Sequence, residues 1–325
     1  MASPNSNFAG DLLSTTVQEL EDELFDNILT KNAITASLKE HGQVKSVDGG
    51  IKIAIPIEYQ ENGSYKRYSG ADLLNTSQQE VFSVFEYDPK QVAINIQAHG
   101  REVHQNMGRS QKRDLVKSRV VNAKHDFENN FNEDLLSDGT ATNQIQGLAI
   151  LIADLPTSGT AGGVSRTTYS FARNQYYRAT TDGGAAMSAA NIVTYMDEVD
   201  VLVQAQKGKT KFILADNAAY KFFEATVHPL QRINQEKGAL GKMGFRTYQY
   251  KDAEVVFEGT GSGMPASTMY FVDPEVLELR YYEGRNLVRL PRRDSWNQDS
   301  FIEYLAWMGA LCAKNFKRLG VLNND

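Results

Sequence analysis

The sequence has one cysteine, few histidines and no long apolar run, and each shortage excludes a class of protein. The single cysteine, Cys312, excludes an internal disulfide and a cysteine-based zinc cluster. The longest apolar run, residues 148–153, is far shorter than the roughly 20 residues that span a bilayer. The first ten residues have neither a basic start nor an apolar stretch, so we expect no signal peptide. The simplest prediction is a soluble cytosolic protein with no membrane partner.

Motifs for catalysis or metal binding are weak. Gly208-Lys209-Thr210 matches the end of a phosphate-binding loop, but Val203 stands where the loop's first glycine should be. His99 and His104 flank Glu102, yet no third ligand follows at an ordered spacing. No nucleophile elbow and no Cys–His pairing suggests a covalent mechanism. We therefore predict that the chain is not an enzyme and has no catalytic residue, no cofactor and no metal ion.

Charge and length set the remaining bounds. The net charge of −6 argues against nonspecific nucleic-acid binding by the whole surface, although a local basic patch can still contact a genome. An apolar content of 41% allows a substantial core. The 325 residues suffice for two ordinary domains or for one body with extensions.

Residues 15–29 have the pattern of an amphipathic helix, which Thr15 can cap. The apolar stripe consists of Val17, Leu20, Leu24, Phe25, Ile28 and Leu29. The other face carries Glu19, Glu21, Asp22, Glu23 and Asp26. Since one helix cannot bury its own stripe, this helix must pack on its own chain or on a neighbour, and we favour the neighbour.

After residue 50 the pattern changes to the alternation of a β-strand. The apolar positions are Ile51, Ile53, Ile55, Ile57 and Tyr59. A return strand over 80–87 contains Phe82 and Phe85, which predicts a hairpin with a loop of some twenty residues. A lone hairpin is barely stable in water, so this one requires a partner surface.

A long amphipathic helix is predicted over 110–137, ended by Asp138-Gly139. A second helix follows Ser188, which we expect to cap it, and a third begins at Asp216-Asn217. Strands are predicted at 211–215, 245–250, 253–258, 268–272, 276–281, 286–290 and 299–311. A strand-rich half with two helices on it is typical of an α+β fold.

Several short motifs follow one another along the chain. One is Leu135-Leu136-Ser137-Asp138-Gly139-Thr140, followed by Gln146-Gly147-Leu148. Others are Met269-Tyr270-Phe271-Val272 with Asp273-Pro274-Glu275, and Gly309-Ala310-Leu311 near the end. In this order they resemble the motifs of the major capsid (coat) proteins of tailed bacteriophages, which have the Hong Kong-phage capsid fold. The resemblance covers roughly residues 45–325, and its order of elements carries more weight than any single motif.

The resemblance implies an architecture. Residues 1–45 would be an N-terminal arm, and residues 46–104 an extended E-loop hairpin that lies over the adjacent subunit. Residues 105–187 would form the peripheral domain with its long spine helix. Residues 188–290 would form the α/β axial domain, and residues 291–325 the C-terminal strands that return to the core.

The resemblance also implies a function and partners. The chain would self-assemble through pentamers and hexamers into an icosahedral shell around double-stranded phage DNA, which would lie on its inner face. It would be assembled in the host cytoplasm and reside in the virion. A portal protein and a separate scaffolding protein would be its partners, and a decoration protein could be another.

Candidate inter-subunit contacts follow from the exposed faces that a monomer would leave unburied. They are Ile51, Ile53, Ile55, Ile57, Tyr59, Lys66, Phe82 and Phe85 in the hairpin, Leu20, Leu24 and Phe25 in the arm, and Arg292 and Arg293. Some family members cross-link an E-loop lysine to an asparagine, for which Lys66 is the first candidate donor and Lys52 the second. The basic cluster that contains Arg292 and Arg293 could face DNA, pair with acids across a subunit boundary, or be solvated.

Two other functions stay open. An encapsulin-like nanocompartment has the same fold and stores enzymes, but no cargo-pocket signal is evident here. A cytosolic α/β enzyme would need a paired acid–base set, and none stands out.

Overall fold

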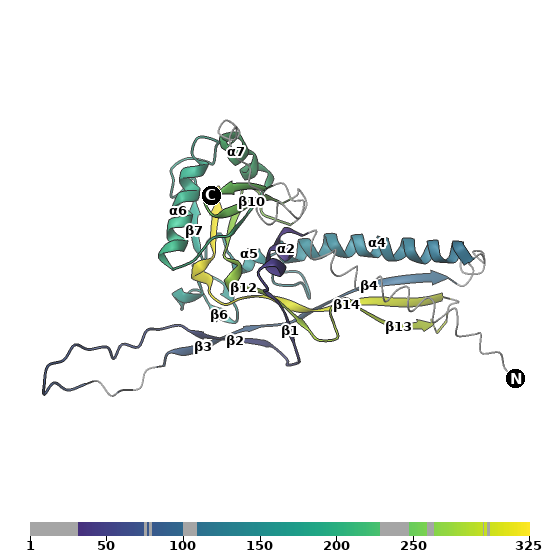
Figure 1. The fold of residues 1–325 in the computed structure, drawn as a ribbon, viewed down its shortest axis with the longest axis horizontal. Helices are drawn as coiled ribbons and strands as arrows, with labels where there is room; N and C mark the ends of the chain where they lie inside the picture. The colour runs from purple at the N-terminus through teal and green to yellow at the C-terminus, as the bar shows by residue number, and fades with distance from the viewer. Residues whose placement is uncertain are drawn as a thin grey trace.

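The computed structural model describes residues 32–74, 77, 80–99, 109–227, 247–258, 263–294, 296–297 and 300–325. Figure 1 shows an elongated α+β molecule, with a compact body under α6 and α7, a hairpin that projects at one end, and a long helix with strands that projects at the other.

The compact body is built around a six-stranded sheet. Its order is β7 (Gln175–Arg178), β15 (Gly320–Asn323), β11 (Met269–Val272), β8 (Phe212–Ala215), β10 (Ala253–Phe257) and β9 (Thr247–Tyr250). Strand β8 is buried on both faces, since Ile213 belongs to one apolar cluster and Leu214 to the other. Helices α6 (Ile192–Ala205) and α7 (Asn217–Val227) cover the Ile213 face. Both faces being covered explains why the β8 sequence is continuously apolar.

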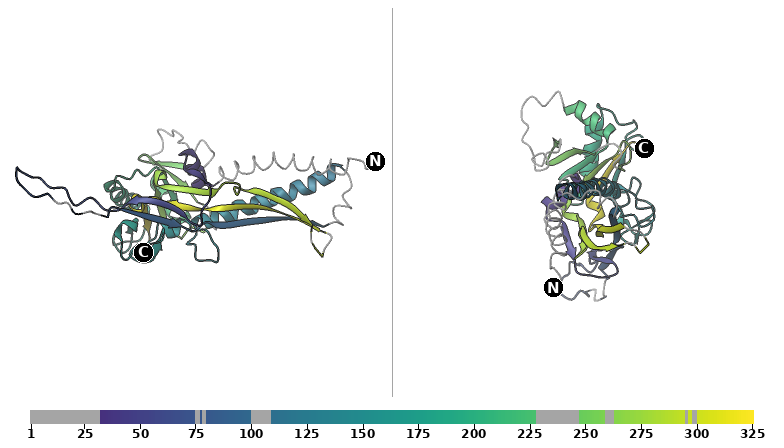
Figure 2. Two further views of the ribbon diagram at one scale, coloured as in Figure 1. Left: turned by 90° about the horizontal axis from the view of Figure 1, so that it is seen from below. Right: turned by 90° about the vertical axis from the view of Figure 1, so that its right-hand side faces the viewer.

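A second, longer sheet forms the other projecting end. Its strands are β1 (Val44–Val47), β12 (Leu277–Tyr282), β14 (Ser300–Ala313), β13 (Val288–Asp294) and β4 (Lys90–His99). Strand β14 pairs with β12 in its last part, with β13 in its first part, and with β4 along most of its length. Helix α4 (Arg109–Leu136) runs alongside this sheet, as Figure 1 and Figure 2 show. Phe131 of α4 meets the buried Trp307 of β14 edge to face, with 5.0 Å between ring centroids.

The remaining elements are short and lie around the main core cluster. Strands β2 (Ile53–Glu58) and β3 (Phe82–Tyr87) form the hairpin, and β5 (Thr160–Ala161) pairs with β6 (Val164–Ser165). Helices α2 (Ala33–Glu40) and α5 (Leu148–Leu151) bury their apolar residues in the same cluster. Among the described residues, 3-10 turns lie at η2 (Ser170–Ala172), η3 (Pro274–Val276) and η4 (Phe316–Arg318).

A buried guanidinium fastens the loops beside this core. Arg166 is buried and donates hydrogen bonds to the carbonyl oxygens of Ile150, Leu151 and Ala172 at 2.7–3.1 Å. It also lies 5.7 Å from the centre of the Phe316 ring. Burial lowers the pKa of Arg166 to about 10, so the group stays charged at neutral pH.

The predicted long helix and hairpin are confirmed, and other predictions need correction. Strand β4, which follows the hairpin in the sequence, belongs to the long sheet, because it pairs with β14 over ten residues. Ser188 does not cap α6, since the helix begins at Ile192 and Asn191 holds the cap position. The Ser188 hydroxyl instead donates to Asn191 Oδ1 at 3.0 Å, within a preceding turn. The predicted helix at 15–29 lies outside the described residues.

The turn after α4 depends on a glycine. A Cβ at Gly147 would lie 2.5–2.6 Å from the carbonyl oxygens of Asp134, Leu135 and Ser137. This close approach lets Leu148 return to the core that Leu135 occupies, and both side chains are fully buried. The turn therefore requires a residue without a side chain at position 147.

We expect Gly147→Ala to lower the free energy of unfolding by about 2–4 kcal/mol, because backbone oxygens must move to admit the methyl group. Urea unfolding of the purified subunit measures this value. Gly49→Ala is the matched control, since its Cβ would meet nothing within 4 Å, and it should change stability by less than about 0.5 kcal/mol. Equal, small effects of the two substitutions would contradict a tightly enclosed turn.

Candidate interaction surfaces

The sequence motifs that could bind phosphate or act as a nucleophile have structural roles in the fold. The Gly208-Lys209-Thr210 segment is a turn, in which a Cβ at Gly208 would lie 2.6 Å from Val203 Cγ1. The Lys209 N–H donates to the buried carboxylate of Asp273 at 3.0 Å. Cys312 is buried, and desolvation raises the pKa of its thiol to about 12, so it is not a nucleophile at neutral pH.

The part of the chain that the structure describes has no metal-ligand cluster and no membrane-spanning helix. There, no group of three or more His, Cys, Asp or Glu side chains is placed to hold a metal ion. No helix in the described ranges is both long and apolar enough to cross a membrane. His104 lies outside the described residues, as does the side chain of His99.

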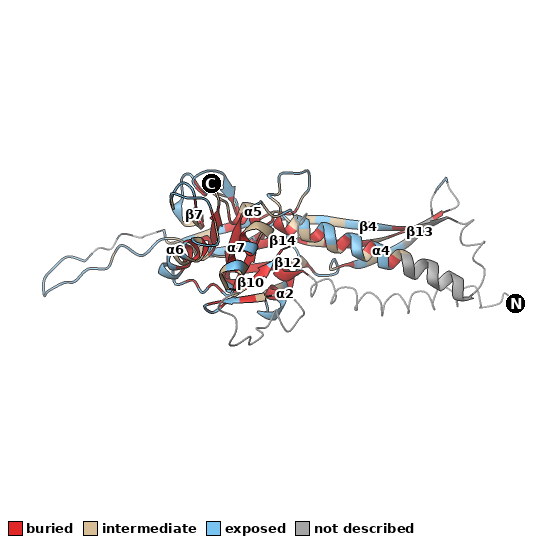
Figure 3. Ribbon diagram, turned by 90° about the horizontal axis from the view of Figure 1, so that it is seen from above, coloured by how far each residue is buried: buried red, intermediate tan, exposed pale blue. Residues whose placement is uncertain are grey.

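The projecting hairpin gathers exposed apolar side chains. Ile51 is 92% exposed, Leu73 89% and Phe82 78%. Tyr65, Tyr68, Leu74 and Val84 are further large exposed side chains of this segment. Figure 3 shows the hairpin tip in the colour of exposed residues, in contrast to the buried centre of the molecule. Soluble monomers rarely leave such an apolar extension uncovered, so residues 51–84 form a candidate contact surface.

The base of the hairpin is fixed to the core of its own subunit. Tyr87 is buried, and its hydroxyl donates to the carbonyl oxygen of Ala313 at 2.7 Å and accepts from the Ala313 N–H at 3.1 Å. Desolvation raises the pKa of Tyr87 well above its usual value, so the hydroxyl keeps its proton. Phe85 meets Phe316 edge to face with ring centroids 5.0 Å apart. The Glu86 N–H donates to Gly162.

The backbone pairing of the hairpin determines which hydrogen-bond donors its outer edge offers. The Tyr59 N–H donates to the carbonyl oxygen of Val81. In the antiparallel register, the N–H groups of Ile57, Ile55 and Ile53 therefore also point toward β3. Pro56 falls between them, at a position where an N–H would face outward. Since proline has no N–H, the outer edge of β2 lacks a donor at its centre.

The structure divides the predicted hairpin contacts into two groups. Ile53, Ile55 and Phe85 are 1–4% exposed, so they cannot offer an inter-subunit surface as predicted. The correction has a simple cause, because the apolar face of the strands packs on the subunit's own core. Ile57 and Tyr59 are half-buried.

The exposed candidates remain predictions. Ile51, Lys66 and Phe82 are exposed, and Lys66 Nζ donates to the carbonyl oxygen of Leu73 at 3.0 Å. This contact lies within the hairpin loop and leaves the predicted cross-link untested. The arm candidates Leu20, Leu24 and Phe25 lie outside the described residues.

The basic cluster on β13 is partly paired within the subunit. Arg289 forms an ion pair with the buried Glu303 of the adjacent strand. A register shift between Leu290 and Arg293 accompanies Pro291. Arg293 is exposed, whereas the side chain of Arg292 lies outside the described part. The role of Arg292 and Arg293 at a subunit boundary therefore stays a prediction.

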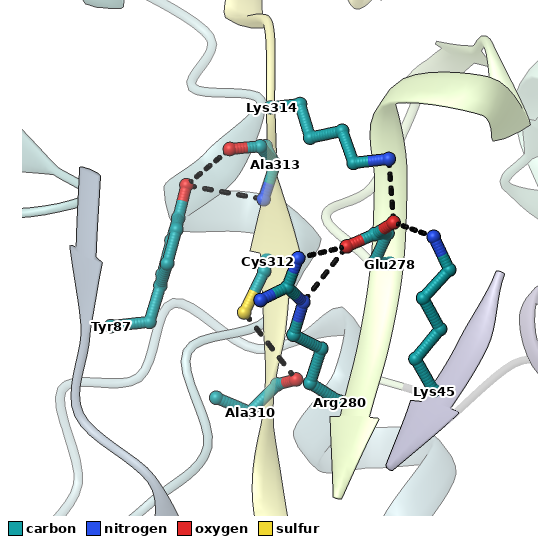
Figure 4. A network of polar contacts seen from close by, with 8 residues as sticks. All are labelled: Lys45, Tyr87, Glu278, Arg280, Ala310, Cys312, Ala313 and Lys314. Carbon is teal, nitrogen blue, oxygen red and sulfur yellow. Dashed lines mark hydrogen bonds and ion pairs between the residues drawn. The ribbon is translucent and has the colours of Figure 1, made fainter. Parts of the chain in front are cut away.

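One charged cluster was missed by the sequence reasoning (Figure 4). Glu278 of β12 has a fully buried side chain, and its carboxylate contacts Lys45 Nζ at 2.5 Å, Lys314 Nζ at 2.5 Å and Arg280 at 2.7 Å. Burial alone would raise its pKa, but hydrogen bonds from Lys314, Lys45 and Arg280 outweigh burial and lower the pKa to about 2. The only signal in the sequence is an acid between two leucines, Leu277 and Leu279.

The Glu278 cluster should make stability depend on pH below neutrality. The folded state holds the Glu278 pKa near 2, against an ordinary value of 4.5. Its stabilisation should therefore be complete above pH 4.5 and be lost as the pH falls toward 2. Because Lys45, Arg280 and Lys314 are partly exposed, we expect a loss of about 1–2 kcal/mol.

Urea unfolding of the subunit at pH 6 and pH 3 measures the loss, which Glu278→Gln should remove. Glu86→Gln is the control, since Glu86 is half-exposed and its carboxylate lies 2.8 Å from Nζ of the equally exposed Lys52. That substitution should leave the pH dependence nearly unchanged. The same pH dependence in the wild-type and Glu278→Gln proteins would contradict the assignment.

Comparison with known proteins identifies the fold. No protein-family model matches the sequence, and no curated protein matches it. The capsid asymmetric unit of cyanophage A-1(L) superimposes with a TM-score of 0.67 at 15% identity, over 87% of this chain and 90% of that one. The capsid of an empty GTA particle gives 0.56 at 12% identity, over 87% and 88%. A chain of Mycobacterium phage Cain gives 0.54 at 11% identity, over 87% and 88%. The chain thus has the fold of phage capsid proteins.

Proposed function

We propose that this chain is a major capsid protein, which assembles with copies of itself into the icosahedral shell of a tailed phage and resides in the virion. The observation that carries the proposal is the superposition on a cyanophage capsid subunit over 87% of this chain. Because the match covers most of both chains, it supports a shared mode of assembly and not merely a shared domain.

The predicted division of the chain is proposed on the same basis. The N-terminal arm would comprise residues 1–45, and the E-loop residues 46–104. The peripheral domain, with α4 as its spine helix, would comprise residues 105–187. The axial domain would comprise 188–290, and β14 and β15 lie in the C-terminal segment 291–325.

Physical reasons favour assembly over catalysis. The exposed side chains of residues 51–84 form an apolar surface that a neighbouring subunit would cover. If the hairpin buried about 800 Å² on its neighbour, that contact would have the size of a standard stable interface. Heterologous contacts of this kind close into rings, as pentamers and hexamers require. We propose a structural, non-enzymatic role without a cofactor.

Further partners follow from the proposed shell. Double-stranded DNA would lie on the inner face, and a portal protein would occupy one vertex. A separate scaffolding protein would direct the shell size, and a decoration protein could bind its outer surface. Assembly in the host cytoplasm would precede packaging.

The proposal is tested by electron microscopy of the purified protein, where we expect rings, shells or tubes built from pentamers and hexamers. Size-exclusion chromatography should show the same large species. A stable monomer that forms no particle, even with phage lysate components added, would refute the proposal.

We expect Leu73→Asp to abolish these particles and to leave the subunit folded, because the side chain is 89% exposed and a buried charge is costly at an interface. The free energy of unfolding, measured by thermal denaturation, should change by less than about 0.5 kcal/mol. Leu73→Met is the matched control and should still assemble. Normal shells from the aspartate variant would show that the hairpin tip makes no essential contact.

A further inference from the structure

Helix α4 carries its charges in the order opposite to the one that its own dipole favours. The first sixteen positions contain six basic residues and one acid: Arg109, Lys112, Arg113, Lys117, Arg119, Lys124 and Asp114. The remaining positions contain acids and no lysine or arginine: Asp126, Glu128, Glu133 and Asp134. A helix N-terminus favours acids and a C-terminus favours bases. Local helix stability therefore does not explain this arrangement.

The excess of positive charge extends to the strands beside the helix. We define the distal arm as residues 109–124 together with β4, β13 and β14. These elements contain ten lysines and arginines against three acids, namely Asp114, Asp294 and Glu303. Glu303 pairs with Arg289, Lys124 lies 4.0 Å from Glu128, and Arg119 donates to the Gln97 carbonyl. The distal arm thus has a net charge of about +7, which attracts an acidic partner.

A segment of opposite charge lies in the same chain. Residues 1–30 contain six acids and no lysine or arginine. The acids are Asp11, Glu19, Glu21, Asp22, Glu23 and Asp26. They equal the whole net charge of −6, so the other 295 residues together are neutral. Five of the six fall within residues 19–26.

The connection is long enough for the two segments to meet. The chain enters the described part at Asn32, and α2 buries its apolar residues in the same cluster as Phe127 and Phe131 of α4. Residues 19–26 precede Asn32 by six to thirteen positions, which span up to about 20–43 Å when extended. Lys124 precedes the end of α4 by twelve positions, or about 18 Å of helix. The acidic segment can therefore reach the basic half of α4 in its own subunit.

We propose that residues 19–26 bind the basic half of α4, residues 109–124, of the same subunit. The short tether gives this contact a high effective concentration, which a second copy or free nucleic acid must overcome. The proposal rests on the charges and the chain path, not on the proposed shell, and its test uses unassembled subunits.

Zero-length carbodiimide cross-linking of carboxylates to lysines, read by mass spectrometry, tests the contact directly. Isotopically light and heavy chains are mixed before the reaction. We expect links from residues 19–26 to Lys112, Lys117 or Lys124, only between chains of the same isotope. Links should decrease at about 0.5 M salt, because the contact is electrostatic. Links to lysines elsewhere in the chain, or links that join light and heavy chains, would overturn the proposal.

Glutamate-specific proteolysis gives a second readout, since Glu19, Glu21 and Glu23 are cleavage sites inside the segment. The triple variant Lys112→Glu, Lys117→Glu, Lys124→Glu should be cleaved there at least about fivefold faster than wild type. Glutamate and lysine have similar helix propensities, so α4 itself should persist, which circular dichroism checks.

The matched control changes three exposed lysines in the compact body: Lys207→Glu, Lys209→Glu and Lys211→Glu. It alters the net charge equally and should leave cleavage at wild-type rates. Equal cleavage of all three proteins would refute the contact. Loss of double-stranded oligonucleotide binding by the α4 variant, without faster cleavage, would assign the basic half to nucleic acid instead and would also refute it.

Discussion

The hydrogen bonding of β14 is the constraint on which the rest of the molecule depends. One strand of 14 residues pairs with β4 and β13 at the projecting end and with β12 near the body. The end of the same strand holds Tyr87, and thereby the hairpin, through the backbone of Ala313. Both projections are therefore attached to one strand, which helps the elongated subunit to keep its shape. The ion pair between Glu278 and Lys314 also joins β12 to the segment that directly follows β14.

Features with a regular local pattern could be predicted from the sequence. The spacing of Phe127, Phe131 and Leu135 indicates the buried face of α4, and the alternation of Ile53, Ile55 and Ile57 indicates β2. The apolar run of β8 indicates a strand covered on both faces. The parallel pairing of β7 with β15 could not be predicted, because it joins four-residue strands separated by more than 140 positions. Neither could the Glu278 cluster, whose three cations come from separate parts of the chain.

Such patterns do not predict which apolar side chains of the hairpin are exposed. Alternation separates two faces of a strand, but it does not say whether the apolar face belongs to the subunit's own core or to a neighbour. Ile55 and Phe85 cover the core of their own chain, whereas Phe82, in the same hairpin, is exposed. The difference arises from the two faces of β3, since Phe82 shares its face with the exposed Val84 and Glu86, whereas Phe85 and Tyr87 lie on the buried face. Side chains such as Leu73 in the loop have no periodicity at all, and only the three-dimensional arrangement separates them from the core.

Pro56 affects how readily the free subunit can aggregate through the edge of β2. A bare strand edge with a regular row of donors can recruit another strand and start a fibre. The outward position of Pro56 interrupts that row at the centre of β2, in the hairpin that also exposes Ile51, Leu73 and Phe82. Growth by continuous sheet extension is thereby discouraged while the subunit is alone, and recognition is left to side chains, whose shapes allow far fewer partners than a backbone does.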